Sequence, residues 1–280
     1  MLYLKKNPGP DLAYQRRGGA QKREGIPIAG HSKWANIKRT KAKVDAQRGA
    51  VFTKMSREII VAARQGGPHP EGNFRLRQAI DRAKAAGVPN DNIKRAIAKG
   101  SGAEGADALE ELRYEGYGPG GVAVLIRALT DNRNRTAGDL RAVFTKFGGN
   151  LGETGCVGWM FDERGQILVP DEESAVNEDD LMMVALEAGA LDVVNHGDSF
   201  EILTEPSDLE KVQEAILAAG FAVGSSEVAD VPSNLQEVTE ADLARKVLRM
   251  MERLDDLDDV QRVAANYDLA ESLSAELEAV

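Results

Sequence analysis

The sequence predicts an α+β protein, in which an N-terminal helical bundle is followed by two α/β domains, the inserted one ferredoxin-like. Apolar residues recur at helical spacing from 31 to 100, and strand-like alternation begins only after a stretch rich in Gly, Ala and Asp at 100–108. Residues 166–229 follow the order β-α-β-β-α-β, which is the ferredoxin-like order. The 280 residues are enough for two or three small domains.

The helices of the first part are indicated by their start and stop signals. A helix over 52–63 has apolar residues on one side, and the Gly-Gly-Pro sequence from Gly66 ends it. Asn73 is expected to cap a second helix that stops at Gly87. Pro89 opens a third, short helix with basic residues on its outer side. These segments predict a small helical bundle with basic outer faces.

The second part alternates strands and helices. The expected strands are 112–115, 122–129, 155–161, 166–169, 191–194, 199–203, 221–229 and 259–266. The expected helices are 134–147, 178–188, 207–219 and 240–254. Turns are expected at 116–121 and 162–165, where Gly, Pro and charged residues gather. The strand at 259–266 could return to the sheet of 109–160 and complete it, which would make that domain discontinuous.

Charge is distributed very unevenly along the chain. The net charge is -10, yet residues 28–102 hold 16 Lys and Arg against 5 Asp and Glu. Residues 1–27 hold 6 basic against 2 acidic residues, and residues 103–280 hold 13 against 38. Such asymmetry is typical of a protein whose basic part binds a polyanion, while the acidic part supports solubility.

The strongest binding signal is a basic segment at 33–48, which has only a thin apolar stripe. We expect this segment to be mobile when free and to become ordered on a polyanion. An ordinary solvent-exposed charged helix is the alternative. The expected nucleic-acid contacts are Lys33, Lys38, Arg39, Lys41, Lys43 and Arg48, continued on the next helix by Lys54 and Arg57.

A second phosphate contact is suggested by the run Asp131–Thr136, which follows a buried strand and starts a helix. Backbone N–H groups at a helix start attract phosphate, and Arg133 and Arg135 would add charge. A capped helix start with two exposed arginines explains the same residues equally well.

Signatures of catalysis, cofactors and metals are missing from the sequence. The glycines at 116–121 have no P-loop Lys and no Rossmann spacing, and His31, His69 and His196 are scattered. Cys156 is the single cysteine, which fits a reducing compartment. We therefore expect a non-enzymatic protein with no cofactor, no metal, no small-molecule substrate and no membrane span. The acidic block at 252–259 is expected to be a solvated helix end rather than a Mg²⁺ site.

Several motifs resemble the YebC/PmpR family. They are Ala29–Lys38 (AGHSKWANIK), Arg48-Gly, Phe52–Lys54, Asn73–Arg77, Tyr114–Gly121 (YEGYGPGG), Asp131–Thr136 (DNRNRT), Gly148–Gly152 and Leu186–Ala190. The resemblance covers about 29–270, and its opening motif is highly specific. The family's basic residues map onto Lys33, Lys38, Arg39, Lys41 and Arg48.

The resemblance implies three domains in a cytoplasmic, non-enzymatic protein. We expect a basic helical domain at 29–106, a central α/β domain made of 107–162 plus 232–275, and a ferredoxin-like domain at 163–231. Residues 1–28 are expected to be a disordered tail or a misassigned start, with a short organellar presequence as the alternative. The oligomeric state is left open.

The resemblance also implies a regulator of gene expression, for which two targets remain. Family members are commonly described as probable transcriptional regulators, and some of them bind promoter DNA. Others, including the mitochondrial translational activator of cytochrome oxidase, act on the ribosome and help it through proline-rich stretches. A basic segment suits either partner, since DNA and ribosomal RNA are both polyanions. Charge without a base-reading element slightly favours RNA.

Overall fold

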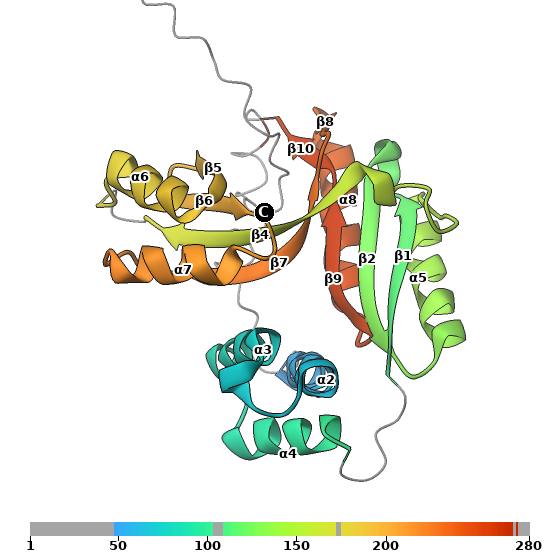
Figure 1. The fold of residues 1–280 in the computed structure, drawn as a ribbon. Coiled ribbons are helices and arrows are strands. Elements are labelled where there is room, and N and C mark those ends of the chain that lie inside the picture. Colours follow the sequence, from blue (N-terminus) through green and yellow to red (C-terminus); the bar gives the residue numbers. More distant parts are fainter. Residues whose placement is uncertain (1–47, 103–108, 172–174, 271–272, 274–280) are drawn as a thin grey trace, which may run out of the picture.

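Three units of secondary structure make up the protein in this computed structural model, which describes residues 48–102, 109–171, 175–270 and 273 (Figure 1). Together they form the α+β architecture that the sequence predicted. No helix within these ranges is both long and apolar enough to cross a membrane.

The described part of the N-terminal unit is a bundle of three helices. These are α2 (Arg48–Gly66), α3 (Phe74–Ala85) and α4 (Asn90–Gly100). Asn73 caps α3 as predicted, because its Oδ1 accepts the Leu76 N–H at 3.0 Å. Its Nδ2 also donates to the Ala62 carbonyl at 2.8 Å, which ties the start of α3 to α2. A Cβ on Gly100 would lie 2.4 Å from the Ile60 carbonyl oxygen, so only glycine permits this approach of α4 to α2.

The central unit is an antiparallel sheet in the order β3-β1-β2-β9. Its strands are β1 (Glu110–Tyr117), β2 (Ala123–Thr130), β3 (Asn150–Leu151) and β9 (Val260–Ala265). Helices α5 (Arg133–Phe147) and α8 (Ala241–Asp255) contact each other and share one core with the sheet. The pairing of β9 with β2 confirms that the last long strand returns to the earlier sheet. A short parallel pair, β8 (Gln236–Val238) with β10 (Tyr267–Leu269), was not predicted.

The inserted unit is a second antiparallel sheet, in the order β5-β6-β4-β7. Its elements are β4 (Phe161–Pro170), α6 (Glu178–Ala188), β5 (Ala190–Asn195), β6 (Ser199–Thr204), α7 (Leu209–Ala218) and β7 (Ser225–Pro232). The first and third strands are central and the second and fourth are at the edges, as in ferredoxin-like folds. Both helices pack into one core with the sheet.

The expected turn at 162–165 is wrong, and so is the strand at 155–161. Strand β4 runs without interruption from Phe161 to Pro170 and pairs with β7 along 161–168. Its charged residues resemble a turn in sequence, but Glu163 accepts hydrogen bonds from Arg113, at 3.1 Å, and from Arg127 of the central sheet. The last strand of the inserted unit also begins at Ser225 instead of 221.

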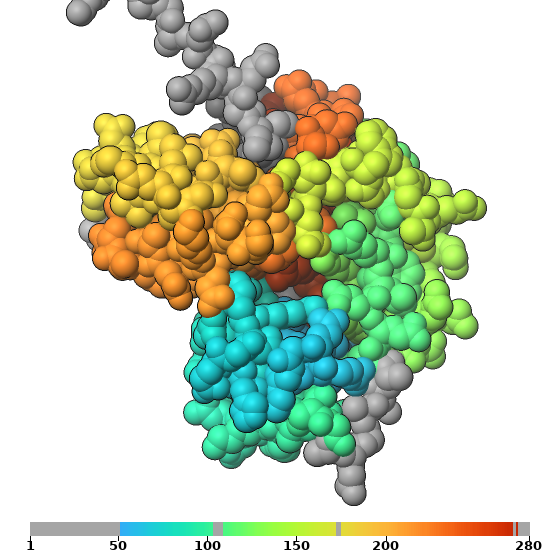
Figure 2. Space-filling model, in the orientation of Figure 1, coloured from blue at the N-terminus to red at the C-terminus, as the bar shows by residue number. Residues whose placement is uncertain are grey.

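The N-terminal unit is seated against both other units. In the space-filling view, the blue-to-teal helices abut the orange end of the inserted unit and the green strands of the central unit (Figure 2). This packing decides which of its cations remain exposed.

Candidate nucleic-acid interface

The predicted nucleic-acid contacts fall into two groups. Lys33, Lys38, Arg39, Lys41 and Lys43 lie outside the described residues, as does the predicted mobility of most of 33–48. Arg48 is the first residue of α2, and its side chain is not described. Lys54 and Arg57 are described in full.

Lys54 lies against the end of α8. The residue is 9% exposed, and its Nζ donates to the carbonyl oxygen of Asp255. The carboxylate of the same aspartate is 3.9 Å away. This lysine, on the first described helix, therefore holds α2 to the central unit.

Arg57 makes the same kind of contact one turn further along α2. Its Nη1 donates to the Asp258 carbonyl and to the Asp259 carboxylate, both at 2.6 Å. In this structure both cations thus join two units, and their contact with nucleic acid stays a prediction.

Asp259 is the centre of this junction. Its carboxylate accepts hydrogen bonds from Arg135 at 2.8 Å, Thr136 at 2.7 Å and Thr130 at 3.2 Å, besides the bond from Arg57. Burial alone would raise the pKa of Asp259, but the bonds from Arg135 and Thr136 and the charge of Arg57 outweigh it and lower the pKa. The expectation of a solvated helix end is therefore wrong for Asp259, which is buried and ion-paired.

The two arginines of the Asp131–Thr136 run differ in this setting. Asn132 caps α5 by accepting the Arg135 N–H at 3.1 Å, which is the capped helix start weighed above. The Arg135 guanidinium binds Asp259 and, at 2.8 Å, Asp131. The Arg133 side chain is 72% exposed, with Glu110 at 4.0 Å. Contact of either arginine with phosphate remains a prediction, and Arg133 has the more accessible guanidinium.

Helix α3 uses its cations to dock on the inserted unit. Arg82 binds Glu58 of α2 and, at 2.9 Å, Glu227 of β7. Arg77 binds Glu210 of α7. The basic N-terminal unit and the acidic inserted unit are therefore joined by complementary charge.

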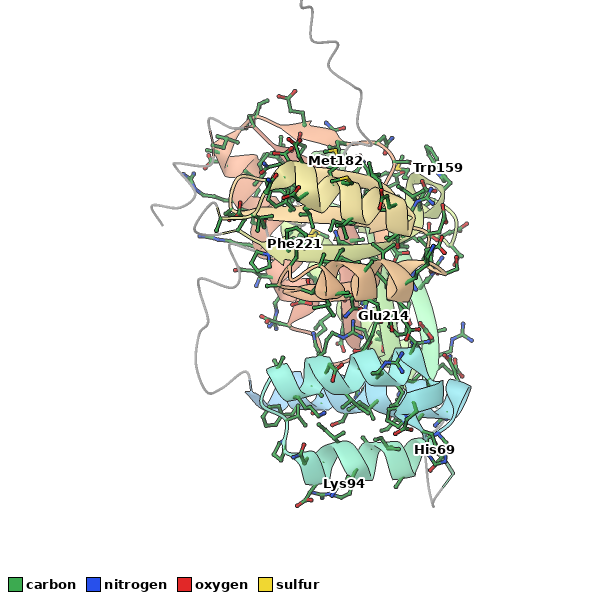
Figure 3. The ribbon with its side chains drawn as sticks, turned by 60° about the vertical axis from the view of Figure 1, so that its left-hand side comes forward. His69, Lys94, Trp159, Met182, Glu214 and Phe221 are labelled. Carbon is green, nitrogen blue, oxygen red and sulfur yellow. The ribbon has the colours of Figure 1, made fainter. Side chains whose placement is uncertain are left out.

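Exposed cations remain on the outer side of α3 and α4. Lys84, Lys94 and Arg95 are exposed, and Figure 3 places Lys94 at the end of the molecule furthest from the central and inserted units. Arg95 folds back onto its own helix, where it binds Asn92 at 2.5 Å and the Asp91 carbonyl at 3.2 Å. The sequence predicted basic residues on the outer side of α4. The expected nucleic-acid contacts lie instead in the denser basic segment at 33–48 and at the start of α2.

A hollow of about 460 Å³ lies beside the Asp259 junction. It is lined by charged residues of α2, α5, α8 and the α8–β9 turn, among them Arg57, Arg135, Asp139, Arg253 and Asp256. Its lining includes both cations and carboxylates, so it lacks the single sign of charge that would select one kind of ion.

No group of His, Cys, Asp and Glu among the described residues has the geometry of a metal site. Burial, followed by the nearby Glu115 carboxylate, raises the pKa of the Cys156 thiol. The thiol is therefore held in its protonated, less nucleophilic form.

The chain matches known proteins over almost all of the described residues. Residues 32–103 match the family described as "TACO1/YebC protein N-terminal domain", and residues 109–267 match "TACO1/YebC second and third domain". The bounds of these two matches separate the helical unit from the two sheets.

Curated relatives are similar over their whole length. A "Probable transcriptional regulatory protein" of Desulfitobacterium hafniense (strain DSM 10664 / DCB-2) is 54% identical over 249 residues, which are 89% of this chain and 99% of the relative. A protein of the same description from Nostoc sp. (strain PCC 7120) is 57% identical over 251 residues, covering 89% and 98%. The crystal structure of a conserved hypothetical protein, Aq1575 from Aquifex aeolicus, superposes with a TM-score of 0.77 at 47% identity, covering 85% of this chain and 98% of that one.

Proposed function

Because this chain belongs to the TACO1/YebC family, we propose that it is a cytoplasmic, non-enzymatic, nucleic-acid-binding regulator of gene expression, and in the first place a DNA-binding transcriptional regulator. The names of relatives at 54% and 57% identity support transcription regulation. The observation that carries nucleic-acid binding is the separation of charge, with 16 Lys and Arg against 5 Asp and Glu in residues 28–102.

The contacts of the described helices refine where binding would occur. Lys54, Arg57, Arg77 and Arg82 bind carboxylates or carbonyls of the protein itself. The cations left for phosphate are those of 33–48, which leads directly into α2, together with Lys84 and Lys94 on the outer side of the bundle.

Charge reversal in the full-length protein tests this proposal. The variant Lys38→Glu/Arg39→Glu/Lys41→Glu is expected to lose at least roughly tenfold in affinity for a fluorescent DNA duplex, since each lost phosphate contact removes counterion release. The matched control is Lys211→Glu/Lys246→Glu/Arg249→Glu, which makes the same charge change at three exposed positions of α7 and α8. An equal loss in both variants would show only a general charge effect and would contradict the proposal.

The second candidate is a ribosome-associated translation factor that helps synthesis through proline-rich stretches by contacting ribosomal RNA. It is favoured by the outer face of α4, where Arg95 binds its own helix and Lys94 offers a point charge. Lysine contacts phosphate well, whereas bidentate base reading belongs chiefly to arginine and amide side chains. Such a face gives affinity for a backbone without sequence specificity.

Cross-linking in cells, followed by sequencing of the bound DNA and RNA, separates the two candidates. Enrichment of promoter fragments would support the transcriptional regulator and exclude the translation factor. Enrichment of ribosomal RNA, with co-sedimentation on ribosomes that the triple variant loses, would do the reverse.

A further inference from the structure

The central unit presents a tryptophan to solvent far from the basic helices. Trp159 is 69% exposed, the most exposed of the large hydrophobic side chains among the described residues. It belongs to the segment 152–160, here called the aromatic loop. In Figure 3 its indole projects from the molecule at the opposite end from Lys94. Tryptophan is enriched at binding interfaces, so an indole exposed to this degree is a candidate contact.

The aromatic loop is held by one buried carboxylate. Glu115 of β1 is 5% exposed, and it accepts the backbone N–H groups of Gly155 at 2.8 Å, Val157 at 2.8 Å and Gly158 at 2.6 Å. A Cβ on Gly158 would lie 3.0 Å from a carboxylate oxygen of Glu115, so the loop closes tightly around this group. Glu115 therefore holds the backbone on either side of Cys156 and directly before Trp159.

Two aromatic side chains converge on one carbonyl of this loop. The Trp159 indole N–H donates to the Cys156 carbonyl at 3.3 Å, and the Tyr117 hydroxyl donates to the same oxygen at 3.1 Å. Their polar tips are thus satisfied, while Trp159 keeps most of its surface exposed and Tyr117 is 37% exposed. This arrangement leaves aromatic surface available for stacking.

Helix α5 beside the aromatic loop is basic, although its half of the chain is acidic. Of the 13 Lys and Arg in 103–280, four lie on α5, against one carboxylate, Asp139: they are Arg133, Arg135, Arg141 and Lys146. The segment that follows α5 packs against β1 beside the loop, because a Cβ on Gly149 would lie 2.4 Å from the carbonyl oxygen of Tyr117, whose hydroxyl donates to Cys156 of the loop. Arg141 and Lys146 of α5 are exposed, and Lys146 is in the last turn of the helix, three residues before Gly149.

We propose that the aromatic loop is a second nucleic-acid contact, in which Trp159, flanked by Tyr117, stacks on an unpaired base while cations of α5 neutralise the neighbouring phosphates. Aromatic stacking joined to a basic track is how proteins bind single strands without sequence preference, because every base has a π face. The inference rests on the proposed function and adds a site on a different unit. Flanking cations in an acidic half of the chain favour a polyanion over a peptide as the occupant.

Tryptophan fluorescence in the full-length protein tests this inference directly. The chain has 2 tryptophans, so Trp34→Phe leaves Trp159 as the only reporter. Titration with short oligothymidylate and oligouridylate is expected to quench its emission. Trp159→Ala is expected to weaken single-strand binding roughly 5- to 100-fold, whereas Trp159→Phe retains most of it. Met183→Ala, which truncates another exposed apolar side chain on α6, is the control and should change affinity less than twofold.

The outcomes separate this inference from the proposed function. Unchanged Trp159 emission, with binding that only the 38/39/41 variant loses, would overturn the second site and leave the proposed function standing. Failure to bind either a duplex or a single strand would overturn both. Quenching by an unstructured peptide, but by neither oligonucleotide, would assign the loop to a protein partner and overturn the inference.

Discussion

Arg57 of the first described helix donates a 2.6 Å hydrogen bond to Asp259, which lies 202 positions later and immediately precedes strand β9. This bond joins the N-terminal unit to the central unit. Arg135 and Thr136 of the Asp131–Thr136 run donate to the same carboxylate.

Removing the carboxylate should destabilise the protein markedly. Asp259→Ala leaves two arginines and two threonine hydroxyls without their shared acceptor, and truncating one partner of a buried ion pair costs about 3–5 kcal/mol. The control is Asp258→Ala, because Asp258 is exposed and meets Arg57 only through its backbone carbonyl. Urea unfolding measures both, and equal midpoints would contradict the role given to Asp259.

The same carboxylate should contribute a pH-dependent part of the stability. The folded pKa of Asp259 lies below its ordinary value of about 3.9, so its contribution is complete above that pH and is lost as pH falls through the folded pKa. The difference in unfolding free energy between the wild type and Asp259→Asn should be constant from pH 7 to 5 and shrink below about pH 4. A difference that grows on acidification would contradict this sign.

The aromatic loop should loosen when its buried carboxylate is neutralised. Glu115→Gln replaces one acceptor oxygen with an amide donor that faces backbone N–H groups. Amide exchange at Gly155, Val157 and Gly158 should accelerate at least roughly tenfold, corresponding to about 1.4 kcal/mol or more of lost protection. Glu153→Gln makes the same change at an exposed position of the same loop and should leave this exchange unaltered.

The ion pairs of Arg82, which join the N-terminal and inserted units, should contribute less to stability than the bonds of Asp259. Arg82 is half-buried between Glu58 and Glu227, and Arg262 also reaches Glu227 at 2.8 Å. Arg82→Ala should therefore lower stability by about 1 kcal/mol, since Arg262 still offsets part of the carboxylate repulsion. Lys84→Ala, two residues along the same helix and exposed, should change the thermal midpoint little.

The salt dependence of DNA binding should show whether Lys84 and Lys94 contact phosphates. If Lys84 and Lys94 each neutralise one phosphate, the double alanine variant should bind duplex DNA with a log–log salt slope smaller by about 1.8. Lys211→Ala, an exposed lysine on α7, should leave the slope unchanged. Equal slopes for the wild type and the double variant would exclude these two lysines from the interface.

The elements that sequence reasoning predicted well depend on local signals. Asn73 caps the helix it precedes, and α6 occupies the predicted residues 178–188, because capping and apolar spacing act within a few residues. The ferredoxin-like strand order follows from the alternation of strands and helices. Local signals also explain the error at 162–165, since Glu163 resembles a turn residue until its partners Arg113 and Arg127 are known.

The candidate interface was harder to predict because a cation's role depends on distant residues. Arg57 and Lys54 have the spacing of a nucleic-acid face, yet their partners lie about 200 positions away in sequence. No sequence pattern identified Trp159 as exposed. The loop that carries it is held by Glu115, and in the sequence Glu115 looks like an ordinary strand residue. A count of charges identifies the basic part of a chain. It does not distinguish cations that bind another unit of the same protein from cations that bind nucleic acid.

The return of β9 to the first sheet sets an order for assembly during synthesis. The inserted unit is contiguous from 161 to 232 and has all its strands before the central sheet is complete. Asp259 emerges from the ribosome 202 residues after Arg57, which at about 5–20 residues per second is on the order of 10–40 s. Throughout that interval α2 lacks its Asp259 junction, so the N-terminal unit can bind the inserted unit, through Arg77 and Arg82, before it can bind the central unit.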